Sequence, residues 1–334
     1  MPPNSQSNKV GYQTICTTFR DNTAFLLYLI WPFLLLLLIS IPNFANASSS
    51  SDSSDIKMVV TAAFVSERGL PIYTQVANYL SSKLNRNVDV ISGISYEESN
   101  LLLQQGIIQV GFICGLPFTR EFNENDLIAM PVMATSKGDA PDIPGYDNVP
   151  GKYFSYTIVH KDSPIKSWQD LKGKTYVYND INSNSGYNMP RYKLLQLGAK
   201  SWEDYFSKIS VSGSHEESIR LVSQGIVDAS SVDSLVLDYD RHIGNQDALN
   251  VRVIESLFPK GAGAPPVVLS KHANPELRQK IQNILINMHE DITGRMILDK
   301  ALIKYFEKPD NANYDDIRHM DNAAKAANFK DHQE

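Results

Sequence analysis

Cysteine is almost absent from this chain, which has only Cys16 and Cys114 among its 334 residues. Cys16 lies in an N-terminal segment that we expect to be removed, so the mature chain keeps Cys114 alone and can form no internal disulfide. The seven histidines include no close pair at metal-ligand spacing, and the chain has neither a Gly-x-x-x-x-Gly-Lys phosphate loop nor a full dinucleotide fingerprint. The sequence therefore predicts no metal and no cofactor.

Positive charge is also in short supply. Acidic residues outnumber lysine and arginine, and the formal net charge is -6 at pH 7. Surfaces that bind nucleic acid need clustered lysine and arginine, so nucleic acid is not an expected partner. Long apolar runs are equally scarce, because no run after residues 24–41 reaches the length that spans a bilayer.

The N-terminal segment has the pattern of a secretory signal. Lys9 and Arg20 precede the apolar run at residues 24–41, and Ala45-Asn46-Ala47 forms a small-x-small cleavage site. We expect residues 1–47 to be removed and the mature protein to be periplasmic or secreted. The run of about 18 apolar residues is also long enough to serve as an uncleaved anchor facing the outside. Residues 48–55 are a serine-rich and aspartate-rich spacer.

Strand-like and helix-like stretches alternate along the rest of the chain. The apolar runs at residues 58–65 and 174–178, for example, are typical of buried parallel strands. Their alternation with helical patterns predicts an α/β architecture of mostly parallel sheets flanked by helices. We expect two lobes with a ligand cleft between them, lobe one formed by residues 56–155 and 255–334 and lobe two by residues 156–254.

One part of the sequence recurs after 119 positions. Residues 95–99 (SYEES) correspond to residues 214–218 (SHEES), and each segment is followed after five residues by Gln-Gly-Ile. A serine with glutamate three residues later is a capping box, so both segments are expected to begin a helix. The shift also pairs Tyr96 with His215 and Cys114 with Asp233. It therefore predicts equivalent helix–strand units in the two lobes, with their strand ends facing each other.

A polar loop follows the expected strand at residues 174–178. Residues 183–186 read Ser-Asn-Ser-Gly, and a loop of this kind that opens a helix can direct backbone N–H groups and hydroxyls at an anion. His215 lies in the first turn of the helix that starts after Ser214, so it can face the same point. The positive end of that helix disfavours imidazolium, and we expect a neutral, hydrogen-bonding histidine.

These segments resemble the phosphate, phosphite and phosphonate substrate-binding proteins of ABC transporters. The resemblance extends from Ile56 to about Met320 and is carried by residues 174–176, 182–187, 190, 213–216, 232–234 and 315–320. It implies a two-lobed, type II periplasmic-binding-protein fold with the ligand held between the lobes. It also implies that residues 183–185 hold the anionic head group, that His215 lies beside them, and that Tyr96 closes the site from lobe one.

Three departures from the family pattern concern the ligand. Asn184 stands where the family often has threonine, Cys114 replaces an aromatic residue familiar in phosphonate binders, and residues 261–266 offer no acid for an aminoalkyl tail. The candidate ligand-binding residues are Ser183, Asn184, Ser185, Gly186, His215, Asp233, Tyr96 and Cys114.

The resemblance implies a monomeric binding protein that delivers a small oxyanion, such as phosphonate, phosphite or phosphate, to an ABC transporter permease and catalyses no reaction. Two alternatives stay open. One is a membrane-tethered sensory domain for a similar ligand, if residues 24–41 are retained. The other is a hydrolase in which Cys114 is the nucleophile, His215 the base and Asp233 the group that orients the base.

Each candidate residue also has a purely structural alternative. Residues 183–186 and Asp233 can be helix caps, and Cys114 can be a small buried apolar residue. His215 can be a solvated helix residue, and Tyr96 a packed aromatic. Arg68 is expected on a solvated surface.

Overall fold

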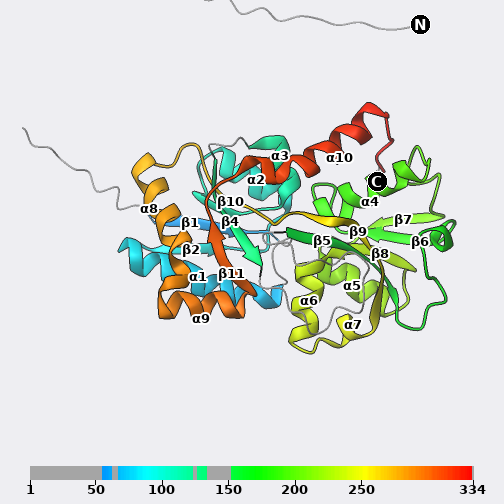
Figure 1. Cartoon of the computed structure of the whole chain (residues 1–334), viewed down its shortest axis with the longest axis horizontal. Helices are drawn as coiled ribbons and strands as arrows, with labels where there is room; N and C mark the ends of the chain where they lie inside the picture. Colours follow the sequence, from blue (N-terminus) through cyan, green and yellow to red (C-terminus); the bar gives the residue numbers. More distant parts are fainter. Residues whose placement is uncertain (1–54, 62–66, 123–125, 134–151, 333–334) are drawn as a thin grey trace, which may run out of the picture. The chain divides into compact units, whose positions relative to one another are not determined.

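The computed structural model describes residues 55–61, 67–122, 126–133 and 152–332. Their strands form two sheets, in the orders β11-β4-β10-β3-β1-β2 and β7-β6-β8-β5-β9 (Figure 1). We call the first sheet with its helices lobe one and the second lobe two. The expected signal at residues 1–47 and the spacer up to residue 54 lie outside the described residues.

Lobe one is built around the six-stranded sheet. Its elements are β1 (Ile56–Val60), η1 (Glu67–Gly69), α1 (Leu70–Leu84), β2 (Val88–Ile91), α2 (Tyr96–Gln104), β3 (Val110–Phe112), α3 (Gly115–Glu121), β4 (Leu127–Met133), β10 (Val267–Leu269), α8 (Pro275–Ile286), η4 (Met288–Glu290), α9 (Ile292–Lys300) and β11 (Ile303–Glu307). Strands β1, β2 and β3 are parallel, whereas β10 is antiparallel to β3 and β4, and β11 is antiparallel to β4. Four strands therefore share one direction, but three of the five neighbouring pairs are antiparallel, so the sheet is mixed.

Lobe two is built around the five-stranded sheet. Its elements are β5 (Lys152–His160), η2 (Gln169–Leu171), β6 (Thr175–Tyr178), the π-helical turn η3 (Asn184–Asn188), α4 (Met189–Gln196), β7 (Lys208–Val211), α5 (His215–Ser223), β8 (Ala229–Asp233), α6 (Ser234–His242), α7 (Gln246–Leu249) and β9 (Val251–Gly263). Strands β6, β7 and β8 are parallel, and β5 is antiparallel to its neighbours β8 and β9. The chain passes from β9 back into β10 of lobe one.

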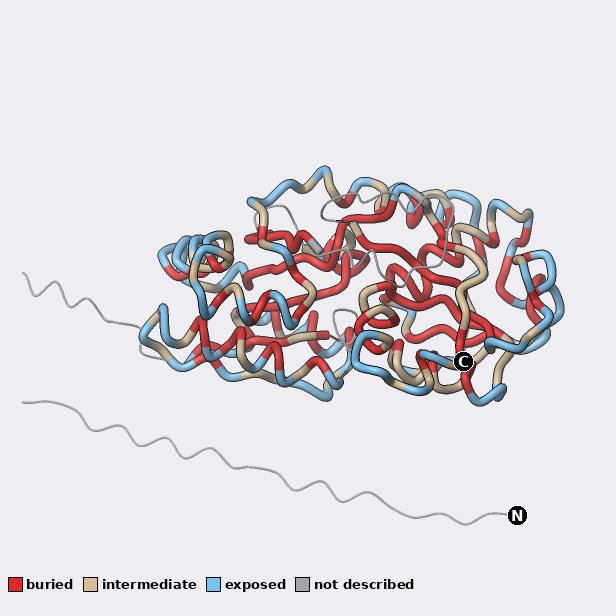
Figure 2. The backbone as a smooth tube through the Cα atoms, turned by 60° about the horizontal axis from the view of Figure 1, so that its bottom comes forward, coloured by how far each residue is buried: buried red, intermediate tan, exposed pale blue. Residues whose placement is uncertain are grey.

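Burial follows the two faces of each sheet, because successive side chains of a strand point to opposite sides. In lobe one, Met58 packs with helices α1, α8 and α9, while the next residue, Val59, packs in a different cluster with Leu103 of α2. In lobe two, Tyr156 packs with α5 and α6, whereas Tyr176 belongs to the aromatic cluster on the other face. The central strands are accordingly buried, whereas the edge strands β2 and β7 carry exposed residues, as do the outer helices and loops (Figure 2).

The C-terminal part of the chain contacts both lobes. After η5 (Asn311–Tyr314), helix α10 (Asp315–Ala326) buries Ile317, Met320 and Ala324, and residues 327–332 end on lobe two, where Lys330 bridges to Ser201. We expected residues 255–334 in lobe one. The expected boundaries at 155/156 and 254/255 also fall inside β5 and β9, because these two strands pair along most of their length in lobe two.

The internal repeat is confirmed as two helix–strand units in different sheets. Ser95 caps α2 by accepting from the N–H of Glu98, and Ser214 caps α5 by accepting from the N–H of Glu217. Helix α2 leads into β3 of lobe one, and α5 leads into β8 of lobe two. Cys114 and Asp233 occupy equivalent positions in the two units, because each is the N-cap residue of the helix that follows its strand.

Arg68 is not simply a solvated residue. Its side chain is 50% exposed, but Nη1 lies 3.1 Å from Oδ2 of Asp240, a fully buried carboxylate on α6. The pair joins η1 of lobe one to lobe two.

Among the described residues, no helix has both the length and the apolar character needed to cross a membrane. The same residues contain no group of histidine, cysteine, aspartate and glutamate side chains that could hold a metal ion.

Candidate functional site

The candidate site lies where strands β6 and β8 of lobe two end. These strands are parallel, so their carboxyl ends meet at one edge of the sheet, which is where open α/β sheets bind ligands. Strand β6 ends at Tyr178 and is followed by Asn179, while β8 ends at Asp233. The first residue of α5, His215, lies at the same edge, because the N–H of Asp233 lies 3.4 Å from its Nδ1.

The Ser-Asn-Ser-Gly segment forms the start of η3. Ser183 is its N-cap, and the Ser183 hydroxyl accepts from the N–H of Gly186 at 3.0 Å. In a π turn the N–H of residue i+5 bonds to the carbonyl of residue i, as Asn188 does to Ser183, so the first N–H groups have no partner inside the turn. The N–H of Asn184 instead donates to Sγ of Cys114 at 3.2 Å, across the two lobes.

Gly186 is needed for space. A Cβ atom there would lie 1.8 Å from Oδ1 of Asn179 and 3.1 Å from Oγ of Ser183, both fully buried. Only glycine lets the turn approach the end of β6 this closely.

His215 faces both serines of the segment. Its ring is fully buried, and Nε2 lies 3.5 Å from Oγ of Ser183 and 3.4 Å from Oγ of Ser185. Burial lowers the pKa of His215 to about 3, so the ring is neutral near pH 7. Since Nδ1 accepts from the N–H of Asp233, the proton of the neutral ring lies on Nε2, which faces the serine hydroxyls. The expected neutral histidine agrees with this geometry, although burial is the cause.

Asp233 combines two roles. One carboxyl oxygen, Oδ1, caps α6 by accepting from the N–H of Leu235 at 2.8 Å. The other, Oδ2, is buried and has no hydrogen-bond partner among the described residues. Burial raises the pKa of Asp233 well above its usual value, because a charged carboxylate is disfavoured out of water. The group can therefore carry a proton and donate it in a hydrogen bond.

Lobe one contributes Tyr96 and Cys114, which are both buried and pack against each other. The hydroxyl of Tyr96 lies 3.3 Å from Nδ2 of Asn179, and that amide nitrogen lies 3.4 Å from Nε2 of His215. Burial raises the pKa of Cys114 to about 12, so its thiol is neutral. The structure thus brings all eight candidate residues into one connected cluster, and none of them is solvated.

Two residues of the cluster escaped the sequence analysis. Asn179 lies between Tyr96 and His215, and its position directly after a parallel strand is the signal that could have identified it. Tyr153 on β5 accepts a hydrogen bond from Nδ2 of Asn184 at 2.8 Å. Nothing in the local sequence marks Tyr153, because β5 is brought beside η3 only by sheet pairing.

The cluster offers neutral hydrogen-bond donors and no fixed positive charge. Its side chains supply the hydroxyls of Ser183 and Ser185, the imidazole N–H of His215, the carboxyl of Asp233 and the hydroxyl of Tyr96. Donors of this kind can hold an oxyanion in a buried place without a counter-charge, as backbone amides and hydroxyls do at helix N-termini. None of the cluster residues named here carries a positive charge at neutral pH.

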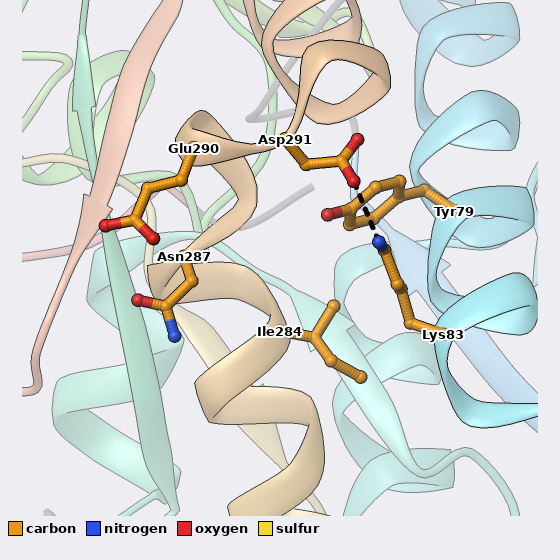
Figure 3. A pocket seen from close by; sticks show the side chains of 6 residues that line it. All are labelled: Tyr79, Lys83, Ile284, Asn287, Glu290 and Asp291. Carbon is orange, nitrogen blue, oxygen red and sulfur yellow. Dashed lines mark hydrogen bonds and ion pairs between the residues drawn. The ribbon is translucent and has the colours of Figure 1, made fainter.

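A separate hollow of about 340 Å³ lies in lobe one between α1 and the segment from α8 to α9. Lys83 points toward Asp291 beside the ring of Tyr79, and the two charged atoms are 2.8 Å apart (Figure 3). Glu290 and Asp291 add negative charge to the lining. Because its lysine is already paired and acids line it, this hollow does not suit an anion.

The buried His215 and Asp233 should give the protein a particular pH dependence. The unfolded His215 takes up a proton below about pH 6.5 and the folded one does not, so stability is lost as pH falls from 6.5 toward 3. Asp233 acts in the opposite sense, because its raised folded pKa makes stability fall as pH rises above 3.8. We expect the acid loss between pH 7 and pH 5 to shrink by about 2 kcal/mol in His215→Gln.

Urea unfolding at pH 5, 7 and 8 measures both effects. Asp233→Asn should instead remove the fall in stability that sets in as pH rises above 3.8. Equal pH profiles for the wild-type protein and His215→Gln would show that the ring titrates normally in the folded state.

Comparison with known proteins adds the family. The model of the periplasmic substrate-binding proteins of ABC phosphonate transporters matches residues 58–314. The chain is 28% identical over 160 residues to the phosphonates-binding periplasmic protein of Escherichia coli K12, covering 46% of this chain and 45% of that protein. It is 25% identical over 179 residues to the probable ABC transporter phosphite binding protein PhnD1 of Prochlorococcus marinus, covering 51% and 60%. The matches span less than two thirds of either relative.

Solved structures show the same fold. A binding protein component of an ABC phosphonate transporter from Pseudomonas aeruginosa has a TM-score of 0.72 at 17% identity, over 83% of this chain and 88% of that one. PhnD1 of Prochlorococcus marinus in complex with methylphosphonate has a TM-score of 0.65 at 19% identity, over 81% and 98%. The architecture is the type II periplasmic-binding-protein fold. Because the family model covers most of its length, the chain belongs to the periplasmic substrate-binding proteins of ABC phosphonate transporters.

Proposed function

We propose that this protein is the substrate-binding component of an ABC importer and holds a small phosphorus oxyanion, a phosphonate, phosphite or phosphate, between its two lobes. The observation that carries the proposal is the buried cluster of neutral donors at η3, His215 and Asp233, which Tyr96 and Cys114 close from lobe one. A permease in the membrane would receive the ligand. The mature protein would act in the periplasm as a monomer, since one chain supplies both sides of the cluster.

The hydroxyl protons of Ser183 and Ser185 remain available for a ligand. The oxygen of the Ser183 hydroxyl accepts from Gly186, and both serine oxygens face Nε2 of His215, so each O–H remains able to donate to an oxyanion. A hydrogen bond to a charged group contributes roughly 1.5 to 3 kcal/mol, so a few such contacts give useful affinity.

Asn184 would act through its position. Its side-chain nitrogen donates to Tyr153 and its side-chain oxygen accepts from Asn188, at 2.8 and 3.0 Å. The amide that replaces a hydroxyl here is therefore engaged inside the protein, and the head group would be held mainly by the serines on either side.

The buried carboxyl group of Asp233 suits a ligand with which it can share one proton. Either the ligand P–OH donates to the buried carboxylate, or the carboxylic acid donates to a P–O⁻ oxygen. Where the ligand's P–OH is the donor, sulfonates and nitrate would bind more weakly, because they are fully ionised and bring no proton. The absence of an acid in residues 261–266 also predicts no preference for the aminoalkyl group of 2-aminoethylphosphonate.

We propose no catalytic role for this cluster. A cysteine nucleophile acts as a thiolate, and the pKa of Cys114 is raised to about 12 by burial. His215 already holds its proton on Nε2, the nitrogen that faces the cluster. The hydrolase alternative therefore lacks both an activated nucleophile and a base.

A thermal-shift screen tests the proposal. Phosphate, phosphite, methylphosphonate and 2-aminoethylphosphonate are compared with methanesulfonate and nitrate at pH 7. A ligand at about 100 times its dissociation constant stabilises the fold by about 2.7 kcal/mol, which is a shift of several degrees. We expect at least one phosphorus oxyanion to do this. Stabilisation by methanesulfonate or nitrate alone would contradict the proposed ligand class.

A further inference from the structure

Helix α10 lies where the buried cores of the two lobes meet. One continuous cluster of buried residues contains Leu116 and Phe118 of lobe one, Ile317 and Met320 of α10, and Leu194 of lobe two, on α4. In Figure 1, α10 extends from α3 toward α4. The tail after α10 is fixed to lobe two, since the N–H of Lys330 donates to the carbonyl of Lys200 at 2.9 Å.

A buried carboxylate on α10, that of Asp321, is paired with both lobes. Arg120 of α3 reaches it with Nη2 at 2.6 Å and Nε at 3.1 Å, and Arg191 of α4 reaches it with Nη2 at 2.5 Å. Lys325 completes the group at 2.7 Å. Although burial by itself raises the pKa of Asp321, the hydrogen bonds from Arg120 and Lys325 hold it well below its usual value. Asp321 is therefore a charged group with partners on every side.

Arg191 connects this carboxylate to η3. Its side chain is 2% exposed, and Nη2 also donates to Oδ1 of Asn188 at 3.1 Å. Asn188 in turn donates from Nδ2 to Oδ1 of Asn184 at 3.0 Å and to the carbonyl of Ile317 at 3.3 Å. Four side chains thus form one relay from α10 to the middle of the Ser-Asn-Ser-Gly segment: Asp321, Arg191, Asn188 and Asn184.

The tail strengthens the same contacts. Asp331 pairs with Nη1 of Arg191 at 3.1 Å, and it accepts from the hydroxyl of Tyr187, a residue of η3, at 2.6 Å. Because η3 leads directly into α4, contacts that hold Tyr187 of η3 and Arg191 of α4 also fix where the N–H groups of the turn point.

We propose that Asp321 and Asn188 are positioning residues for the Ser-Asn-Ser-Gly segment, residues 183–186. In this proposal α10 and its tail set the orientation of η3 through Arg191. Neither residue needs to touch the ligand. The inference rests on the proposed function, because it concerns the segment that would hold the head group. It adds that affinity depends on a C-terminal element whose central residue follows that segment by more than 130 positions.

The first test measures hydrogen exchange of residues 183–189 in the ligand-free protein. Asn188→Leu keeps a similar side-chain volume and removes both the amide donor and the amide acceptor of Asn188. Asp321→Asn removes the charge that holds Arg191. We expect exchange of this segment to accelerate at least tenfold in both variants. Unchanged exchange in both would overturn the proposal, whatever the protein binds.

The second test measures affinity for methylphosphonate by calorimetric titration. Each single variant should weaken binding about tenfold. The affinity of the double variant Asn188→Leu/Asp321→Asn should be no lower than that of the single variant with the lower affinity, because both substitutions interrupt the same chain of hydrogen bonds, the relay described above. Multiplication of the two effects would show that the residues act independently and would contradict the relay.

Asp228→Asn is the matched control. Asp228 accepts from the N–H and the hydroxyl of Thr175, both at 2.8 Å, at the opposite end of β6 and β8. We expect this variant to lower the melting temperature while leaving the exchange of residues 183–189 and the affinity unchanged. If it alters them as much as Asn188→Leu does, the effect is general destabilisation and the positioning role is wrong.

Asp331→Ala replaces Asp321→Asn in the same cycle if the latter does not fold, since Asp331 is 42% exposed and also holds Arg191. A wild-type protein that fails to bind any phosphorus oxyanion contradicts the proposed function, while the exchange test still decides the positioning role. Wild-type binding with unchanged exchange and affinity in the variants contradicts only the positioning role.

Discussion

Gly186→Ala is expected to weaken methylphosphonate binding at least a hundredfold, equivalent to about 2.7 kcal/mol. The added Cβ would lie 1.8 Å from Oδ1 and 2.9 Å from Cγ of Asn179, distances that no packed side chain adopts. Asn179 cannot move freely, because it is fully buried between Tyr96 and His215. Either η3 or Asn179 must therefore leave its place, and both belong to the proposed site.

Gly173→Ala separates this effect from a general loss of stability. Gly173 has φ +78, where alanine is strained, but nothing lies within 4 Å of its Cβ position. We expect this variant to lower the melting temperature and to bind methylphosphonate normally. Wild-type affinity in Gly186→Ala, measured by calorimetric titration, would show that the close approach of Gly186 to Asn179 has no part in binding.

Removing one serine hydroxyl should weaken binding tenfold to a hundredfold, about 1.4 to 2.8 kcal/mol. Ser183→Ala and Ser185→Ala each remove an O–H next to Nε2 of His215. Ser183→Ala also removes the N-cap hydroxyl that accepts from the N–H of Gly186, so it should lower the free energy of unfolding by about 1 kcal/mol as well. His215→Ala should weaken binding to a similar degree, because its Nε2 faces both hydroxyls.

Ser230→Ala is the control for these variants. Ser230 is fully buried in β8, and its hydroxyl donates to the carbonyl of Val177 at 2.8 Å, away from the cluster. Its affinity should equal that of the wild type. Full affinity in Ser183→Ala, Ser185→Ala and His215→Ala together would disprove the proposed site and leave the family assignment intact.

Much of the local structure was predictable because its causes are local. The capping box of Ser214 and Glu217 starts α5 as expected, and the strand expected at residues 174–178 appears as β6 from Thr175 to Tyr178. Pro190 is the second residue of α4, which begins at Met189 after the π turn. Proline suits the first helical turn, since its missing N–H would have no partner there.

Some site properties needed the surroundings of a residue. His215 was expected to be neutral because of the helix dipole, whereas its full burial is the larger cause. Asp233 and Ser183 could be helix caps or ligand groups, and the structure shows that capping uses only part of each side chain. A cap and a ligand contact are therefore compatible at these two residues.

The sequence by itself determined the α/β alternation, the repeated capping boxes and the Ser-Asn-Ser-Gly segment, since each depends on residues within one helix or loop. Only the tertiary structure placed Asn179 between Tyr96 and His215, paired Arg68 with Asp240, and joined Asp321 to Arg120 and Arg191. These partners are separated by between 36 and 201 positions. No spacing rule connects them, because contacts at such separations are set by how sheets and helices pack.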